Sequence, residues 1–210
     1  MTDFDRAAFG RFLELYAARI RERRDELTEL DSAIGDADHG VNMDRGFTAV
    51  TEKLPTLADA DLGTTAKTVG MTLISTVGGA AGPLYGTFFL RLATALGETE
   101  AVDAAALGVA LRAGLEGVVA RGKAVLDDKT MVDAMTPAID AFEASSADGI
   151  DAALSAAAEA AAAGRDRITP LIARKGRASY LGERSANHQD PGATSTTILF
   201  ESLRDAVAEG

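Results

Sequence analysis

The stretch GMTLISTVGGAAGPLYGTFF, residues 70–89, decides the fold class. It lies in a run without charged residues between Lys67 and Arg91, a length that suggests a membrane span. Glycines and Pro83 interrupt the run at its centre, and serine and threonine recur through it, so one spanning helix is a poor interpretation. We predict two buried helices joined by a tight glycine turn, and no membrane association.

The rest of the chain is also helical in pattern. Hydrophobic residues recur at helical spacing, and no segment shows sustained period-two alternation. We therefore predict an all-α fold of eight helices without a sheet, in a single domain over residues 1–210. The expected helices run to about residue 30, over 43–54, 62–77, 83–97 and 103–121, from 129 through Pro137, and over 151–164 and 193–209. Residues 173–191 form the longest expected irregular stretch.

Composition excludes several classes of function. Lys and Arg number 21 against 32 Asp and Glu, which gives a net charge of -11. Binding to a nucleic-acid backbone requires a basic face, so nucleic acid is excluded as a partner. The chain has no cysteine, which excludes disulfides and thiolate chemistry. The N-terminus is acidic and unlike a signal peptide, so we expect a cytoplasmic protein.

The sequence GVVARGK, residues 117–123, imitates a phosphate-binding P-loop. Ala124 stands where that motif has the Ser or Thr that touches magnesium, and the segment ends a helical pattern instead of following a strand. We interpret it as the end of a helix.

The acidic stretch LDSAIGDADHGVNMDRGF, residues 30–47, is the strongest candidate for chemistry. Asp31 is expected at a helix end, and Asp36 and Asp38 in the loop that follows. Three neighbouring carboxylates repel one another unless a cation lies among them, and oxygen ligands favour magnesium or calcium. The EF-hand glutamate is missing, and magnesium shares its shell with phosphates, so a phosphoryl site is one interpretation. A solvated acidic loop is the other.

Two further segments fit a phosphoryl site. The sequence GGAAG, residues 78–82, would let backbone N–H groups approach a phosphate, although glycine-rich helix junctions also serve plain packing. Residues 174–195 contain Arg177, Arg184, His188 and Asp190 just before a helix. Arginines there could neutralise a transferring phosphoryl group.

Four motifs together resemble the nucleotide-binding L subunits of the dihydroxyacetone kinase family. They are IGDADHGVNMDRGF (34–47), GMTLISTVGGAAGPLYGTFF (70–89), RGKA with DDKTMVDAMTPA (121–124 and 127–138) and RKGRASYLGERSANHQDPGATS (174–195). The resemblance implies a closed barrel of eight antiparallel helices with the nucleotide site at one end.

The resemblance also implies a set of site residues. Asp31, Asp36 and Asp38 would hold two Mg²⁺ ions and, with Arg177, would serve catalysis. The implied contacts to ADP or ATP are His39, Asn42, Ala80, Ala81, Gly122, Met131, Arg177, Asp190, Pro191 and Gly192. The family often has serine at the position of Ala81 and commonly glycine at that of Asn187, so a hydroxyl contact to phosphate is lost and the loop shape is in question.

The activity implied by the resemblance is phosphoenolpyruvate-dependent phosphorylation of dihydroxyacetone. A phosphohistidine carrier, the M subunit, would phosphorylate ADP that stays bound to this chain, and a K subunit would hold the ketone covalently. A homodimer is among the candidate assemblies. Two alternatives stay open. One is an ATP-dependent kinase subunit with an exchangeable nucleotide or a different acceptor. The other is a nucleotide-loaded regulatory module without catalysis.

Overall fold

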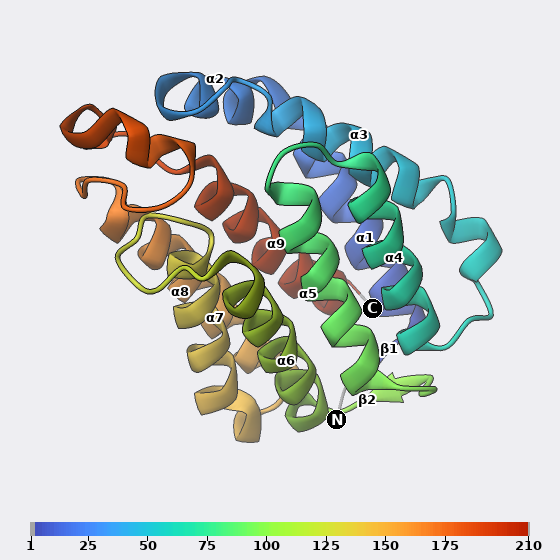
Figure 1. The fold of residues 1–210 in the computed structure, drawn as a ribbon. Coiled ribbons are helices and arrows are strands. Elements are labelled where there is room, and N and C mark those ends of the chain that lie inside the picture. The colour runs from blue at the N-terminus through green and yellow to red at the C-terminus, as the bar shows by residue number, and fades with distance from the viewer. Residues whose placement is uncertain (1–2, 210) are drawn as a thin grey trace.

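The computed structural model describes residues 3–209, and this part of the chain is mostly helical (Figure 1). The α-helices are α1 (Arg6–Glu22), α2 (Arg24–Ile34), α3 (His39–Thr51), α4 (Leu62–Thr76), α5 (Ala81–Leu96), α6 (Ala104–Gly122), α7 (Val132–Ser145), α8 (Ile150–Ile168) and α9 (Pro191–Ala208). Three 3-10 helices accompany them, η1 (Leu54–Leu57), η2 (Ser146–Asp148) and η3 (Arg177–Ser185). The helical fold class is confirmed, but the predicted count of eight is wrong, since residues 3–209 contain nine α-helices.

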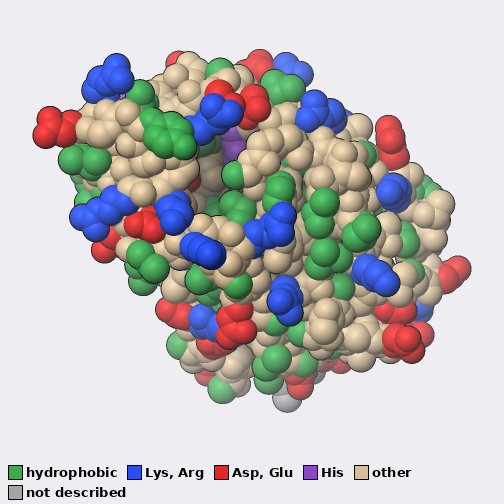
Figure 2. Space-filling view, viewed as in Figure 1, with side chains coloured by type: hydrophobic (Ala, Val, Ile, Leu, Met, Phe, Trp, Pro, Cys, Tyr) green, Lys and Arg blue, Asp and Glu red, His purple; other side chains and the backbone are tan. Residues whose placement is uncertain are grey.

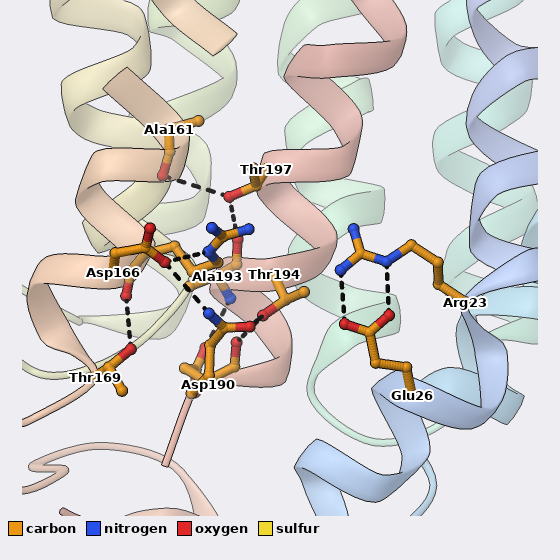
Figure 3. Close-up of polar contacts among 11 residues, drawn as sticks. Arg23, Glu26, Ala161, Asp166, Thr169, Asp190, Ala193, Thr194 and Thr197 are labelled. Carbon is orange, nitrogen blue, oxygen red and sulfur yellow. Dashed lines mark hydrogen bonds and ion pairs between the residues drawn. The ribbon is translucent and has the colours of Figure 1, made fainter. Parts of the chain in front are cut away.

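The additional helix arises because the first predicted helix is two helices. The chain bends at Arg23, whose φ of -97° and ψ of 14° leave the helical region, and α2 starts at the next residue. No glycine or proline marks this joint. The Arg23 guanidinium instead donates two hydrogen bonds, of 2.8 and 2.7 Å, to the carboxylate of Glu26 in the first turn of α2 (Figure 3). The bend turns α2 toward α3, where the metal-binding candidates lie.

The glycine-rich stretch 70–89 forms two helices, as predicted. The turn between α4 and α5 contains Gly79 at a φ of 64°. A Cβ at Gly70 would lie 2.8 Å from the carbonyl oxygen of Gly86, so only glycine allows these two helices to pack this closely. Within residues 3–209, the structure has no helix with the length and apolar character that crossing a membrane requires.

One small sheet contradicts the prediction of none. Strand β1 (Phe4–Asp5) pairs antiparallel with β2 (Ala101–Val102), with Phe4 opposite Val102. Two-residue strands are too short to produce an alternating pattern, so no periodicity indicates them.

The helices enclose one large hydrophobic core. Helices that follow one another from α3 to α9 pack side by side, α9 packs against α1, and α1 packs against α3. The core contains Tyr16, Phe47, Phe89, Phe142 and Phe200, each at most 1% exposed. Helix α2 lies outside this ring and contacts α3, α9 and η3 at one end of the molecule (Figure 1).

Three further segments, 151–164, 117–123 and 173–191, can be compared with their predicted structure. The alanine-rich segment is helical, within α8. Residues 117–122 of GVVARGK end α6 and Lys123 caps it, so the P-loop interpretation is excluded. The stretch 173–191 is less irregular than predicted, because η3 occupies its middle. The 3-10 turns of η3 do not produce a helical sequence pattern, because Gly182, at a φ of 54°, interrupts them.

Candidate functional site

The three aspartates of the acidic stretch lie together. Asp31 is in the last turn of α2, and Asp36 and Asp38 follow in the loop before α3. One oxygen from each carboxylate lies within 4.8 Å of the others. Ala37, at a φ of 61°, bends the loop back so that the later two side chains face the first. Three oxygen ligands at this spacing suit a hard divalent cation.

Asp31 also fixes the loop. Its Oδ2 atom accepts hydrogen bonds from the backbone N–H of Asp38, at 2.8 Å, and of His39, at 3.1 Å. These N–H groups begin α3, so the Asp31 carboxylate binds the start of that helix to the end of α2. Asp31 is 8% exposed, which makes it the most buried of the three.

The aspartates border a cavity of about 150 Å³. Ten of the predicted site residues line it, namely Asp31, Asp36, Asp38, His39, Asn42, Ala80, Ala81, Arg177, Asp190 and Pro191. The space-filling view shows a hollow between the η3 segment and the turn joining α4 to α5, with a histidine side chain inside (Figure 2). The cavity thus combines residues of three separate segments, 31–42, 78–81 and 177–191.

The N-terminus of α5 forms the wall opposite the aspartates. A Cβ at Gly79 would lie 4.0 Å from an Asp38 carboxylate oxygen. Ala80 precedes α5, and no side chain caps the first N–H groups of that helix. Uncapped N–H groups at a helix start bind anions, and the alanine at position 81 keeps these backbone donors although it offers no hydroxyl.

The side chain of His39 points to a buried hydroxyl network. Its Nε2 lies 2.9 Å from Ser195 Oγ, which lies 2.8 Å from the hydroxyl of Tyr85. Burial lowers the pKa of His39 to about 4, although the nearby Asp31 and Asp38 carboxylates oppose this shift. The imidazole is therefore neutral at physiological pH.

Arg177 reaches the cavity from η3. Its Nη2 lies 3.0 Å from Asp36 Oδ2, and the two side chains are 66% and 35% exposed. An ion pair this exposed is screened by water and is weak. The guanidinium can therefore exchange the Asp36 carboxylate for a phosphate.

Asp190 begins α9 on the far side of the cavity. Its Oδ2 accepts the N–H of Ala193 at 2.8 Å, so the carboxylate caps the helix (Figure 3). Burial raises the pKa of this carboxyl to about 7, and the Ala193 N–H opposes the shift. The nearby Asp133 and Asp31 carboxylates raise it further, while Lys129 lowers it.

Three predicted contacts do not line the cavity. Gly122 ends α6, where a Cβ would lie 3.1 Å from Leu84 of α5. Met131 is buried just before α7, and a Cβ at Gly192 would lie 3.5 Å from the Met131 Cβ. Their roles stay predictions. Arg184 and His188 are exposed and also outside the cavity lining. Asn187 has a φ of 64°, which fits a position that is commonly glycine.

A comparison with family models places the chain. Residues 33–205 match the family model described as DAK2 domain. The chain belongs to the DAK2 domain family. The matched range includes all the residues that line the cavity except Asp31.

Two ADP-binding kinase subunits resemble the chain over most of its length. The ADP-binding subunit DhaL of the PEP-dependent dihydroxyacetone kinase of Escherichia coli (strain K12) is 49% identical over 185 residues, 87% of this chain and 88% of that protein. The ADP-binding subunit DhaL of the PTS-dependent dihydroxyacetone kinase of Lactococcus lactis subsp. lactis (strain IL1403) is 41% identical over 201 residues, 95% of this chain and 94% of that protein.

A solved structure is also similar to this DAK2 domain. It is the dihydroxyacetone kinase from C. freundii in complex with AMP-PNP and Mg²⁺, with a TM-score of 0.73 and 25% sequence identity. The similarity covers 95% of this chain and 33% of that one, so the chain spans about a third of the length of the solved kinase.

Some residues of the DAK2 site were absent from the sequence prediction. Ser195 contacts both His39 and Tyr85 through its hydroxyl, and the Tyr16 hydroxyl donates to the Ser195 carbonyl at 3.1 Å. Both tyrosines occupy apolar helix faces and fit the hydrophobic pattern, so no spacing distinguishes them from core residues. Their hydroxyl groups meet only when α1, α5 and α9 pack together.

Asp190→Asn should change the pH dependence of stability. The pKa of the Asp190 carboxyl is raised in the folded state, so the folded protein holds this proton to higher pH than the unfolded chain does. The free energy of unfolding of the wild type therefore falls as pH rises from about 4 to 7. Asparagine also caps helices but does not titrate. Between about pH 5 and pH 8 the metal-free variant should gain about 1–2 kcal/mol relative to the wild type. Urea unfolding at both pH values measures this.

Asp61→Asn is the matched control. Asp61 caps α4, and the Thr64 N–H lowers the pKa of its carboxyl from the ordinary 3.8. Its titration therefore lies below the tested range, and we expect no relative change between the two pH values. Equal pH dependence in the Asp190→Asn variant and the wild type would contradict the proposed burial of that carboxyl.

Proposed function

We propose that this chain is the ADP-binding subunit of a PEP-dependent dihydroxyacetone kinase. The observation that carries the proposal is the cavity, in which three clustered carboxylates face the uncapped start of a helix and an arginine. The sequence similarity to two DhaL subunits over most of their length supports it. We further propose that residues 1–210 act as one domain, and that the closed ring of α1 and α3 to α9 is the eight-helix barrel.

The residues present suit magnesium and a nucleotide diphosphate. Asp31, Asp36 and Asp38 offer only oxygen ligands, which Mg²⁺ prefers, and we propose that they hold two ions. The similar kinase structure that contains AMP-PNP and Mg²⁺ supports this assignment. When bound, the magnesium nucleotide supplies the phosphoryl group in a form whose charge is neutralised and whose terminal phosphate is oriented.

The residues of the chain have separate tasks in this proposal. The N–H groups at Ala80 and Ala81 bind phosphate oxygens. Arg177 adds positive charge where the phosphoryl group transfers, in place of its weak pair with Asp36. His39 is neutral and held by Ser195, so it contributes a hydrogen bond without adding charge.

The remaining predicted contacts complete the proposed nucleotide site. Asn42 lines the same cavity beside Gly78. The Asp190, Pro191 and Gly192 turn adjoins Met131, and Gly122 adjoins α5. We propose that Gly122 and Met131 line the adenine end of the nucleotide, that Asn42 contacts the nucleotide, and that the Asp190, Pro191 and Gly192 turn completes the site.

The overall reaction that we propose needs two partners. A phosphohistidine carrier, the M subunit, donates the phosphoryl group, and a K subunit presents dihydroxyacetone. The net change moves one phosphoryl group from the carrier's histidine to a hydroxyl of the ketone. The N–P bond breaks as the O–P bond forms, and the proton that the hydroxyl loses is balanced by the one that the histidine nitrogen regains. The ADP at this site is regenerated in each cycle.

The first experiment is to denature the purified protein and identify any released nucleotide by mass spectrometry. We expect about one ADP per chain after long dialysis with magnesium. This result requires that the protein concentration lie far above the dissociation constant of ADP. The protein should then form dihydroxyacetone phosphate only when the K subunit, the carrier and phosphoenolpyruvate are all present. A chain that is empty and turns over with free ATP would instead be an ATP-dependent kinase subunit. Retained ADP without transfer would indicate a regulatory module.

A further inference from the structure

Lys129 is a buried cation that lies outside the cavity. Its side chain is 1% exposed, and its Nζ donates to the carbonyl oxygens of Thr169 at 2.8 Å, Leu171 at 2.9 Å and Ser185 at 2.7 Å. An ammonium group has three N–H donors, so these carbonyls use all of them. Among the ion pairs of residues 3–209, none involves this lysine. Burial lowers the pKa of this ammonium group, and the nearby Asp190 carboxylate opposes that shift. A buried charge is costly unless such partners compensate it.

The three carbonyls define the base of a loop. Leu171 and Ser185 flank residues 172–184, which we name the arginine loop because this segment contains Arg177. One ammonium group therefore holds both ends of this loop and also holds Thr169, at the end of α8. The loop lies at the end of the molecule that also contains α2 (Figure 1).

Other contacts strengthen the same base. The hydroxyl of Ser185 accepts the N–H of Ala173 at 2.9 Å and donates to the carbonyl of Gly182 at 2.6 Å. The N–H of Arg174 donates to the carbonyl of Asp128 at 3.0 Å, next to Lys129 in sequence. The segment that precedes Met131 and the arginine loop are thus joined at one point.

The opposite end of the loop has weaker support. The ion pair of Arg177 with Asp36 is exposed and screened. The apolar contact beneath the loop is small and consists of Ile34, Ala173, Ala178 and part of Leu181. The base is therefore the better supported end of the loop that carries Arg177.

We propose that Lys129 is a positioning residue that holds the arginine loop closed, and that it thereby sets how long the nucleotide stays bound. The proposal rests on the proposed function, since it takes a magnesium nucleotide as the ligand. Lys129 touches no cavity residue itself and acts through Arg177. A lysine suits this position because its unbranched side chain fits between backbone segments and ends in an ammonium group with three N–H donors.

The test measures the dissociation rate of a fluorescent ADP analogue, mant-ADP, from the intact protein in magnesium. Lys129→Met keeps the length of the side chain but removes its charge and donors, and leaves three carbonyls unpaired. We expect dissociation to become about 10-fold faster or more, because each unpaired carbonyl favours an open loop. Lys53→Met is the matched control, since Lys53 donates to Thr72 on another part of the surface. It should not change the rate.

Two measurements separate positioning from general stability. In an Arg177→Gln background, Lys129→Met should add little, because both changes remove the same contact. In Lys129→Ala, added methylammonium should enter the space and slow dissociation again, while the wild type and Lys53→Met should not respond. Independent, multiplying effects of the Lys129 and Arg177 changes, or no response to methylammonium, would overturn the proposal.

A second variant covers the case in which Lys129→Met does not fold. Ser185→Ala removes the two hydroxyl contacts at the loop base and leaves the lysine in place. It should also speed dissociation, and its effect should also vanish with Arg177→Gln; a wild-type rate would overturn the proposal. If the wild type itself bound no mant-ADP, the proposed function would fail instead, which distinguishes the two failures.

Discussion

Asp38→Asn should lower the rate of dihydroxyacetone phosphate formation by about 10³-fold or more, the equivalent of about 4 kcal/mol in the barrier. Asp38 offers one of the three clustered carboxylate oxygens, and its side chain does not cap α3. The change removes a negative ligand and keeps the size of the side chain. The rate is measured with saturating carrier and K subunit, at several magnesium concentrations.

The stability of the metal-free protein should not fall with the rate when Asp38 is replaced by asparagine. Without a cation, three close carboxylates repel one another, so removing one charge should leave the chelator-treated protein at least as stable as the wild type. Asp25→Asn, at an exposed position of α2, is the control and should affect neither rate nor stability. An unchanged rate for Asp38→Asn would exclude this side chain from the metal site.

The sequence predicted the local parts of the site better than their arrangement. Asp31 at a helix end and Asp36 and Asp38 in the next loop are where the sequence placed them. These positions follow from short-range rules of helix pattern and charge. The His39 side chain differs, because its partner Ser195 is 156 positions away and becomes a neighbour only after α3 and α9 pack.

Errors in the fold prediction have the same physical origin. The bend at Arg23 lies within a charged helical sequence, so no local signal marks it, and the packing of α2 on α3 determines it. Lys129 is a stronger example. The sequence places Lys129 at the start of the sixth predicted helix, but α7 begins at Val132, and the fold encloses the lysine with three carbonyls from distant segments.

Gly40→Ala should be the most damaging small substitution near the site. A Cβ at this position would lie 2.0 Å from the carbonyl oxygen of Arg24 and 2.9 Å from the backbone nitrogen of Thr28. Both obstacles are backbone atoms of α2, so α2 and α3 would have to separate. We expect the free energy of unfolding to fall by about 2–4 kcal/mol. Guanidinium unfolding of the purified variant measures this loss.

The same separation should also weaken nucleotide binding beyond its effect on stability. The hydrogen bonds from Asp38 and His39 to the Asp31 carboxylate connect these two helices, and they orient the aspartates. Gly10→Ala in α1 is the matched control, because no neighbouring atom lies within 4 Å of a Cβ there. It should raise stability by about 0.5–1 kcal/mol, since alanine loses less backbone entropy than glycine in a helix. If Gly40→Ala behaved like Gly10→Ala, close contact between α2 and α3 would not be what holds the three carboxylates together.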